Sequence, residues 1–326
     1  MYDISLPPHF NFSQTPTPII PVKKCFTDSR HTRIYFKRDD LTGLELSGNK
    51  VRKLDFLLKD AVEQGAGRII TCGGMQSNHC RAAAYMARKL DLKTTLVLRE
   101  SPSGSATGNY LLNALLDIDI RLIRPELYAN VDAEMEKIAS LYPESTYVIP
   151  EGGSNAIGAW GYVRAFLEIQ QQIRENDLSI DTIMVSTGSG GTHAGLLIGK
   201  LLTGSDLDIL SINVCDTAAE FVQKIDAIMH DFKQQFNENL HWQKDDIRII
   251  DGFVGEGYGV ISQREVQIIK RLAQTEGLLI DPVYGAKALL GLEHHIRNDS
   301  LKDRSILFIH TGGVFGLFPY GNQLMA

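Results

Sequence analysis

The chain has 326 residues, of which 44% are hydrophobic and 22% are charged, and its formal net charge at pH 7 is −6. This is the composition of a globular protein long enough to divide its core between two domains. No block of lysine and arginine stands out, so nucleic acid is not an expected partner, and no apolar run is long enough to predict a membrane span.

The predicted strands alternate with segments of helical periodicity, after a proline-rich start (residues 15–22) that we interpret as an irregular arm. We expect strands at residues 33–37, 68–72, 94–98, 120–123, 146–149, 182–186, 209–214, 247–250 and 306–310. Such alternation predicts an α/β fold with mostly parallel sheets. The four cysteines form no C-x-x-C pair, and the first residues lack a basic segment followed by an apolar one. We therefore expect free thiols and a cytoplasmic location.

The stretch ELSGNKVRKLDFLL predicts a helix that begins near Ser47. A helical wheel predicts a buried stripe at Lys50, Leu54, Leu57 and Ala61, and a solvated side at Arg52, Asp55, Lys59 and Glu63. Burial and the positive end of the helix both lower the pKa of a lysine amine. Lys50 is thus a candidate for bonding to an aldehyde or for proton transfer, with a lysine that reaches out to solvent as the alternative.

Three predicted strands end in glycine-rich turns that open helices, in the segments RIITCGGMQSNH, TYVIPEGGSN and TIMVSTGSGGTHAG. Turns of this kind present backbone N–H groups to an anion. The last of them can hold a phosphate without a compensating lysine. A dinucleotide site, which would use Gly188, Gly190 and Asp216, is the weaker alternative because the third glycine is displaced.

A buried amine and a phosphate loop together suggest pyridoxal 5′-phosphate. No group of histidine, cysteine and acidic residues has the spacing of metal ligands, so we expect no metal. A nicotinamide oxidoreductase and a non-catalytic binding protein remain as competing interpretations.

Five segments, SGNKVRKLDFLL, GGMQSNHCRAAA, STGSGGTHAG, DPVYGAKALLGL and LFIHTGG, resemble the 1-aminocyclopropane-1-carboxylate deaminase and D-cysteine desulfhydrase family. These are fold-type II pyridoxal-phosphate enzymes, similar in fold to the tryptophan synthase β subunit. The resemblance implies a homodimer whose subunits have two domains and a cofactor in the cleft between them. It places a small α/β domain at residues 48–160 and a large domain at 1–47 and 161–326.

The resemblance also implies roles for individual residues. Lys50 resembles the cofactor-binding lysine and catalytic base, and Tyr258 and Tyr284 resemble two active-site tyrosines, the second packed against the cofactor ring. The implied site for the substrate carboxylate is Ser77, Asn78 and His79, with Asn78 also on the pyridine hydroxyl. The implied phosphate loop is Ser189, Gly190, Gly191 and Thr192.

Two positions favour the desulfhydrases within this family. Gly285 stands where the deaminases have a glutamate that engages the pyridine nitrogen, and Thr311 stands where they have leucine. A hydroxyl at that nitrogen makes a weaker electron sink, which suits expulsion of a thiolate better than cyclopropane opening. We therefore expect α,β-elimination of D-cysteine to pyruvate, sulfide and ammonia. The alternatives are 1-aminocyclopropane-1-carboxylate deamination and a lyase reaction on another β-substituted amino acid.

Overall fold

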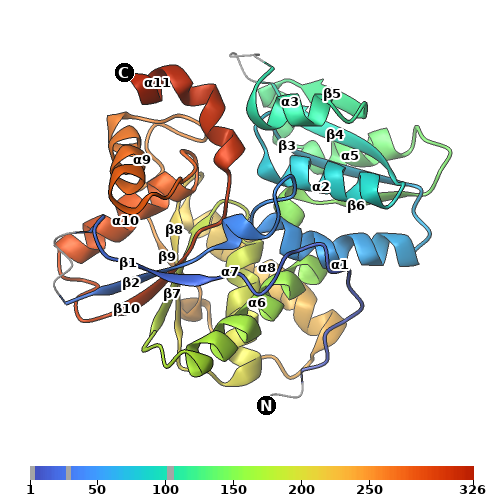
Figure 1. The fold of residues 1–326 in the computed structure, drawn as a ribbon. Helices are drawn as coiled ribbons and strands as arrows, with labels where there is room; N and C mark the ends of the chain where they lie inside the picture. Colours follow the sequence, from blue (N-terminus) through green and yellow to red (C-terminus); the bar gives the residue numbers. More distant parts are fainter. Residues whose placement is uncertain (1–3, 27–30, 101–105) are drawn as a thin grey trace.

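Two β-sheets organise the computed structural model, which describes residues 4–26, 31–100 and 106–326 (Figure 1). The larger sheet has six strands in the order β1 (Ile19–Val22), β2 (Arg33–Lys37), β10 (Ser305–Ile309), β7 (Thr182–Thr187), β8 (Asp208–Asn213) and β9 (Arg248–Ile250). The smaller has four, in the order β5 (Asp119–Ile123), β4 (Lys93–Arg99), β3 (Arg68–Gly74) and β6 (Thr146–Ile149). All neighbouring strands are parallel except β1 and β2.

The helices cover both faces of each sheet. Those longer than one turn are α1 (Lys50–Glu63), α2 (Asn78–Lys89), α3 (Gly108–Ala114), α5 (Val131–Ala139), α6 (Ala156–Glu175), α7 (Gly191–Thr203), α8 (Ala218–Phe236), α9 (Gln263–Glu276), α10 (Gly285–Arg297) and α11 (Gly321–Met325). The remaining helical segments are α4 (Pro125–Tyr128) and the 3-10 segments Asp39–Leu41, Glu151–Gly153, Lys244–Asp246 and Val314–Tyr320. The prediction of an α/β fold with mostly parallel sheets is confirmed.

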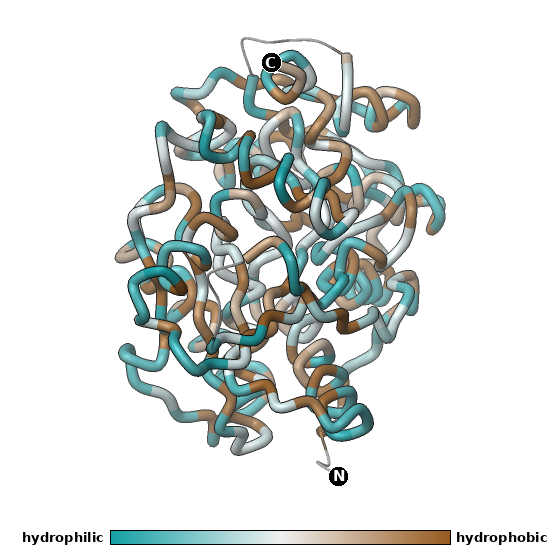
Figure 2. The backbone as a smooth tube through the Cα atoms, turned by 60° about the vertical axis from the view of Figure 1, so that its left-hand side comes forward, coloured by the Kyte–Doolittle hydropathy of each residue, from teal (hydrophilic) through white to brown (hydrophobic). Residues whose placement is uncertain are grey.

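Alternation along the strands explains how each sheet is covered. In β3, Ile69 packs with α1 and α2 on one face, whereas Ile70 and Cys72 pack with α5 on the other. In the larger sheet, α9 and α10 form one apolar layer and α6, α7 and α8 the opposite one. Hydrophobic and hydrophilic segments accordingly alternate along the backbone (Figure 2).

The two sheets draw on different parts of the chain. The four-stranded sheet lies wholly between Arg68 and Ile149, and the six-stranded sheet combines strands from both chain ends. We propose residues 48–160 as one unit and 1–47 with 161–326 as the other on this basis. Helix α1 packs against both α2 and α6, so it contacts both units.

The prediction of an irregular arm at residues 15–22 is partly wrong. Ile19–Val22 forms strand β1, which pairs antiparallel with β2. Pro21 obscured this strand in the sequence. A proline lacks the N–H that an inner strand must donate, but β1 is an edge strand with β2 as its one neighbour.

The solvated side predicted for α1 is also partly wrong. Arg52 and Asp55 are buried, at 2% and 0% exposure. Arg52 donates to both oxygens of Asp39, at 2.8 and 2.9 Å, and to Glu168 at 2.9 Å. The N-terminal arm covers Asp55, which accepts the backbone N–H of Phe12 at 2.9 Å. The helical wheel is wrong at these two positions because groups from distant segments bind the two side chains.

Candidate active site

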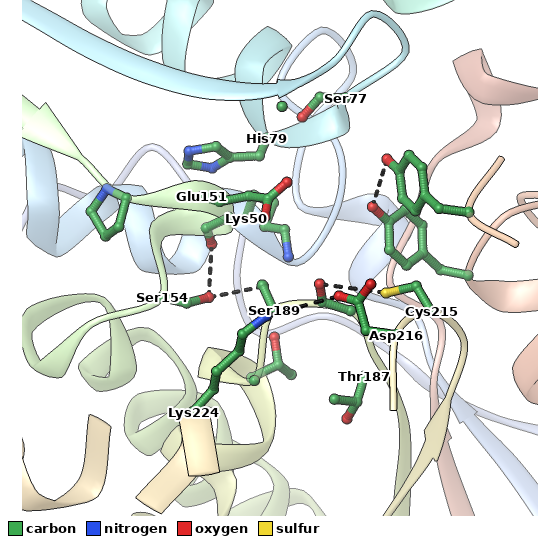
Figure 3. A pocket seen from close by; sticks show the side chains of 18 of the residues that line it. Lys50, Ser77, His79, Glu151, Ser154, Thr187, Ser189, Cys215, Asp216 and Lys224 are labelled. Atoms are coloured by element: carbon green, nitrogen blue, oxygen red, sulfur yellow. Dashed lines mark hydrogen bonds and ion pairs between the residues drawn. The ribbon is translucent and has the colours of Figure 1, made fainter. Parts of the chain in front are cut away.

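A cavity of about 880 Å³ opens where the three glycine-rich turns meet. These turns follow β3, β6 and β7 and lead into α2, α6 and α7, as the sequence predicted. Parallel sheets gather ligands at the carboxyl ends of their strands. The wall includes the predicted residues Lys50, Ser77, Asn78, His79, Ser189, Gly190, Thr192, Tyr258, Tyr284 and Thr311. In Figure 3, Lys50 lies between Ser77, His79 and Glu151 on one side and Thr187, Ser189 and Cys215 on the other.

Lys50 is the first residue of α1, and its amine faces the cavity. Burial lowers the pKa of this amine to about 8, although the charge of Glu151 opposes the shift. Gly152, at a φ of 66°, lies beside this amine, and a Cβ there would stand 2.5 Å from Ser189 Oγ. A lowered pKa is what the helix start and the buried stripe predicted, and the amine is a competent nucleophile near neutral pH.

The turn after β7 forms a cup of backbone donors. Gly190 has a φ of 83° and caps α7, so the first N–H groups of that helix point out of its end. Asn49 Nδ2 donates to Thr192 Oγ1 at 3.1 Å, and Ser154 Oγ donates to Ser189 Oγ at 2.9 Å. The hydroxyl of Thr187 is buried and has no hydrogen-bond partner among the described residues. These features fit a phosphate group.

A second lysine reaches this cup, which the sequence interpretation missed. Lys53 is fully buried and donates to Gly152 O at 3.2 Å and Ser154 Oγ at 3.1 Å. A Cβ on Gly191 would stand 2.8 Å from its ammonium. Burial, then the charge of Lys50, lowers its pKa well below the ordinary value. A phosphate dianion bound in this cup would stabilise the protonated form of Lys53. The sequence contained a signal for this second lysine, because Lys53 follows Lys50 by three residues and residues three apart share a helix face.

The start of α2 forms a second anion site. Ser77 caps the helix by accepting the N–H of Cys80 at 3.2 Å, which leaves the N–H groups of Asn78 and His79 without a hydrogen-bond partner among the described residues. The His79 side chain is engaged elsewhere. Thr71 donates its hydroxyl proton to Ile149 O, so His79 Nε2 must donate to Thr71 Oγ1, at 2.8 Å. A carboxylate would therefore meet the backbone N–H of His79 and not its ring.

Tyr258 and Tyr284 form a pair on another wall of the cavity. The Tyr284 hydroxyl donates to the Tyr258 hydroxyl at 2.9 Å, and burial raises the pKa of both. Asp281 holds the backbone ahead of α10 by accepting the N–H groups of Val283, Tyr284 and Gly285 at 2.7–3.1 Å. Burial raises the pKa of Asp281 to about 6. The sequence interpretation did not single out this aspartate.

Comparison with known proteins identifies the family of the chain. A family model described as pyridoxal-phosphate dependent enzyme matches residues 11–312. The chain belongs to this family. An inferred 1-aminocyclopropane-1-carboxylate deaminase from Thermotoga maritima is 39% identical over 97% of the chain and 99% of its own length. A bifunctional, mitochondrial D-cysteine desulfhydrase/1-aminocyclopropane-1-carboxylate deaminase from Arabidopsis thaliana is 38% identical over 98% of the chain and 82% of its own.

Solved structures agree with this assignment. The crystal structure of a 1-aminocyclopropane-1-carboxylate deaminase homologue superposes with a TM-score of 0.88 at 35% identity, covering 98% of this chain and 95% of its own. A hydrogen sulfide-producing enzyme from Fusobacterium nucleatum shares the fold alone, with a TM-score of 0.66 at 15% identity over 93% of this chain and 96% of its own. The fold-type II prediction is thus confirmed.

Pyridoxal phosphate is the cofactor of this family, and the cavity fits it. The cup after β7 and Lys53 suit its phosphate, and the Lys50 amine suits its aldehyde. The nicotinamide interpretation is overturned by the family match; Asp216, which it needed for a ribose, lies near Lys224 at 3.8 Å. Within the described ranges, no three metal-ligating side chains cluster, and no helix has the length and apolar character to cross a bilayer.

Proposed function

We propose that this enzyme is a lyase that converts D-cysteine and water to pyruvate, sulfide and ammonia. Pyridoxal phosphate, when bound, supplies an electron sink for the bonds of the substrate α-carbon. The chain's own residues then have four tasks: to hold the cofactor, to bind the substrate carboxylate, to move the α-proton and to protonate the departing sulfur.

Lys50 is our proposed cofactor-binding residue and base, since its lowered pKa leaves a useful fraction of neutral amine near pH 7. The free N–H groups at the start of α2 bind the substrate carboxylate, with Ser77 and Asn78 beside them. Tyr258 accepts a hydrogen bond from Tyr284, so its own proton is free to be donated to sulfur. Its raised pKa keeps that proton in place until the sulfur departs.

The observation that carries the choice of D-cysteine is the packing around Gly285. A Cβ at this position would stand 2.3 Å from Ile280 Cγ1 and 2.8 Å from Asp281 Oδ1, so the glutamate of the deaminases has no room there. Thr311 lines the cavity and offers a hydroxyl in place of a carboxylate. A hydroxyl at the pyridine nitrogen, in place of a carboxylate, would make the cofactor a weaker electron sink. A weaker sink is sufficient when the leaving group is a thiolate.

A substrate comparison tests this proposal. We expect equal amounts of sulfide and pyruvate from D-cysteine, with a kcat/KM at least about tenfold above that for 1-aminocyclopropane-1-carboxylate, whose product 2-oxobutyrate is assayed separately. A higher kcat/KM for the cyclopropane substrate would show the proposal to be wrong.

The names of the related proteins favour 1-aminocyclopropane-1-carboxylate deamination as the second candidate. A lyase reaction on another β-substituted amino acid is the third. We also propose a cytoplasmic homodimer, supported by the family resemblance; sedimentation of the purified protein at a single subunit mass would contradict the dimer.

A further inference from the structure

The cavity wall holds an arginine that none of these roles uses. Arg99 is the last residue of β4 and is half-buried. Its guanidinium carbon lies 5.1 Å from the ring centroid of Tyr128 and 4.9 Å from that of Tyr258. In the described part of the chain, no carboxylate forms an ion pair with it. Two aromatic rings thus hold a cation that has no carboxylate partner among the residues the structure describes.

The strand register places Arg99 next to the proposed carboxylate site. Its backbone pairs with that of Gly74 in β3, and neighbouring strands lie about 4.8 Å apart. Ser77, the cap of α2, follows three residues after Gly74. A Cβ on Gly74 would stand 3.4 Å from the Tyr258 ring, so the ring and the arginine border the same side of the cavity. An amino acid anchored by its carboxylate at this helix start has its β-substituent beside them.

The acidic side chains of Glu151 and the exposed Asp132 line the cavity with Arg99 and Tyr128, and Glu151 is the one that contacts Tyr128. It accepts the Tyr128 hydroxyl at 2.7 Å and is itself exposed, so solvent screens its charge more than that of the half-buried arginine. The guanidinium, which has no carboxylate partner in residues 4–26, 31–100 and 106–326, therefore presents N–H donors to an incoming ligand. A planar fork of donors suits a bidentate oxyanion best and also accepts a single anionic atom.

We infer that Arg99 determines specificity for the substrate side chain, and that the enzyme prefers amino acids whose β-substituent is negatively charged. The inference rests on the proposed function, because that function places the carboxylate at the α2 start. The sulfur of D-cysteine gains negative charge as its bond to Cβ breaks, and Arg99 stabilises this departing hydrosulfide until Tyr258 donates a proton to it. Cyclopropane opening releases no such anion.

An isosteric pair of ligands tests the inference on the holoenzyme. D-Aspartate carries a β-carboxylate, and D-asparagine replaces it by a neutral amide of the same size. By calorimetric titration we expect D-aspartate to bind at least about tenfold more tightly to the wild type. Arg99→Met should remove this preference and Arg99→Lys should keep part of it. Arg88→Met, which removes an exposed arginine from α2, should leave it unchanged.

Each result separates the inference from the proposed function. Equal affinities in the wild type, binding of neither ligand, or a preference that persists in Arg99→Met would overturn the role of Arg99. If Arg99→Met does not retain its cofactor, the inference is tested by the affinities of the wild type and of Arg99→Lys for D-aspartate and D-asparagine. Because titration needs no turnover, a clear preference without sulfide release from D-cysteine would contradict the proposed reaction alone.

Discussion

Lys50→Ala is expected to lower the rate of pyruvate formation from D-cysteine by at least about a thousandfold. The substitution removes the amine that we assign both to the cofactor aldehyde and to the α-proton, and a positioned general base alone contributes about 10²–10⁴ in rate. The fold should survive, because Lys50 begins α1 and is not a member of its apolar core. Steady-state assays at saturating pyridoxal phosphate measure the effect.

Lys59→Ala provides the matched control, since this lysine lies on the same helix and pairs with Glu63 at the surface. Its activity should equal that of the wild type. Retention of more than about a tenth of the wild-type rate by Lys50→Ala would be incompatible with the assigned role, because such a small loss does not correspond to removal of a general base.

Asp39→Ala is expected to lower the free energy of unfolding by about 3–5 kcal/mol, the usual cost of breaking a buried ion pair on one side. Asp39 is fully buried and accepts hydrogen bonds from Arg52, from Thr17 at 2.8 Å and from Tyr162 at 2.6 Å. Without it, Glu168 is the one carboxylate among the described residues that still pairs with Arg52, and Lys37 contacts the same carboxylate. Urea unfolding followed by circular dichroism measures the loss.

The pH dependence of this loss has a definite sign. Burial alone would raise the pKa of Asp39, but the charge and hydrogen bonds of Arg52 overcome it and hold the pKa below its ordinary value. A lowered folded-state pKa stabilises the protein above the unfolded-state pKa of about 3.9, and the contribution disappears as pH falls through the folded value. The difference in the free energy of unfolding between the wild type and Asp39→Ala should therefore become smaller at acid pH.

Glu63→Ala removes an exposed carboxylate from a surface pair and should change the unfolding free energy by less than about 1 kcal/mol. A similarly small change in Asp39→Ala at neutral pH would contradict the view that the buried charges beneath α1 depend on one another.

The local sequence pattern was sufficient to predict those features of the fold and the site that a single physical rule determines. Runs of β-branched residues marked the central strands, and glycines before helix starts marked the three turns that meet at the cavity. The spacing of Lys50 with Leu54 and Leu57 correctly indicated a lysine that desolvation shifts. The family resemblance named residues from distant segments, and the structure brings them to one cavity.

The local sequence pattern was insufficient where residues far away in the sequence determine whether a side chain is buried. The burial of Arg52 depends on Asp39 and Glu168, which are far from it in sequence, and no helical wheel contains them. Lys53 and Arg99 were overlooked because a cation near a helix start or a strand end is ordinarily solvated. Their importance depends on the turns, rings and strands that surround them in the folded chain.

The most direct test of the central claim is the position of the pyridoxyl group after borohydride reduction of the holoprotein, mapped by mass spectrometry of its peptides. We predict a single adduct on Lys50. An adduct on Lys53, three residues along the same buried helix face, or on any other residue would contradict the claim, as would its absence after incubation with pyridoxal phosphate.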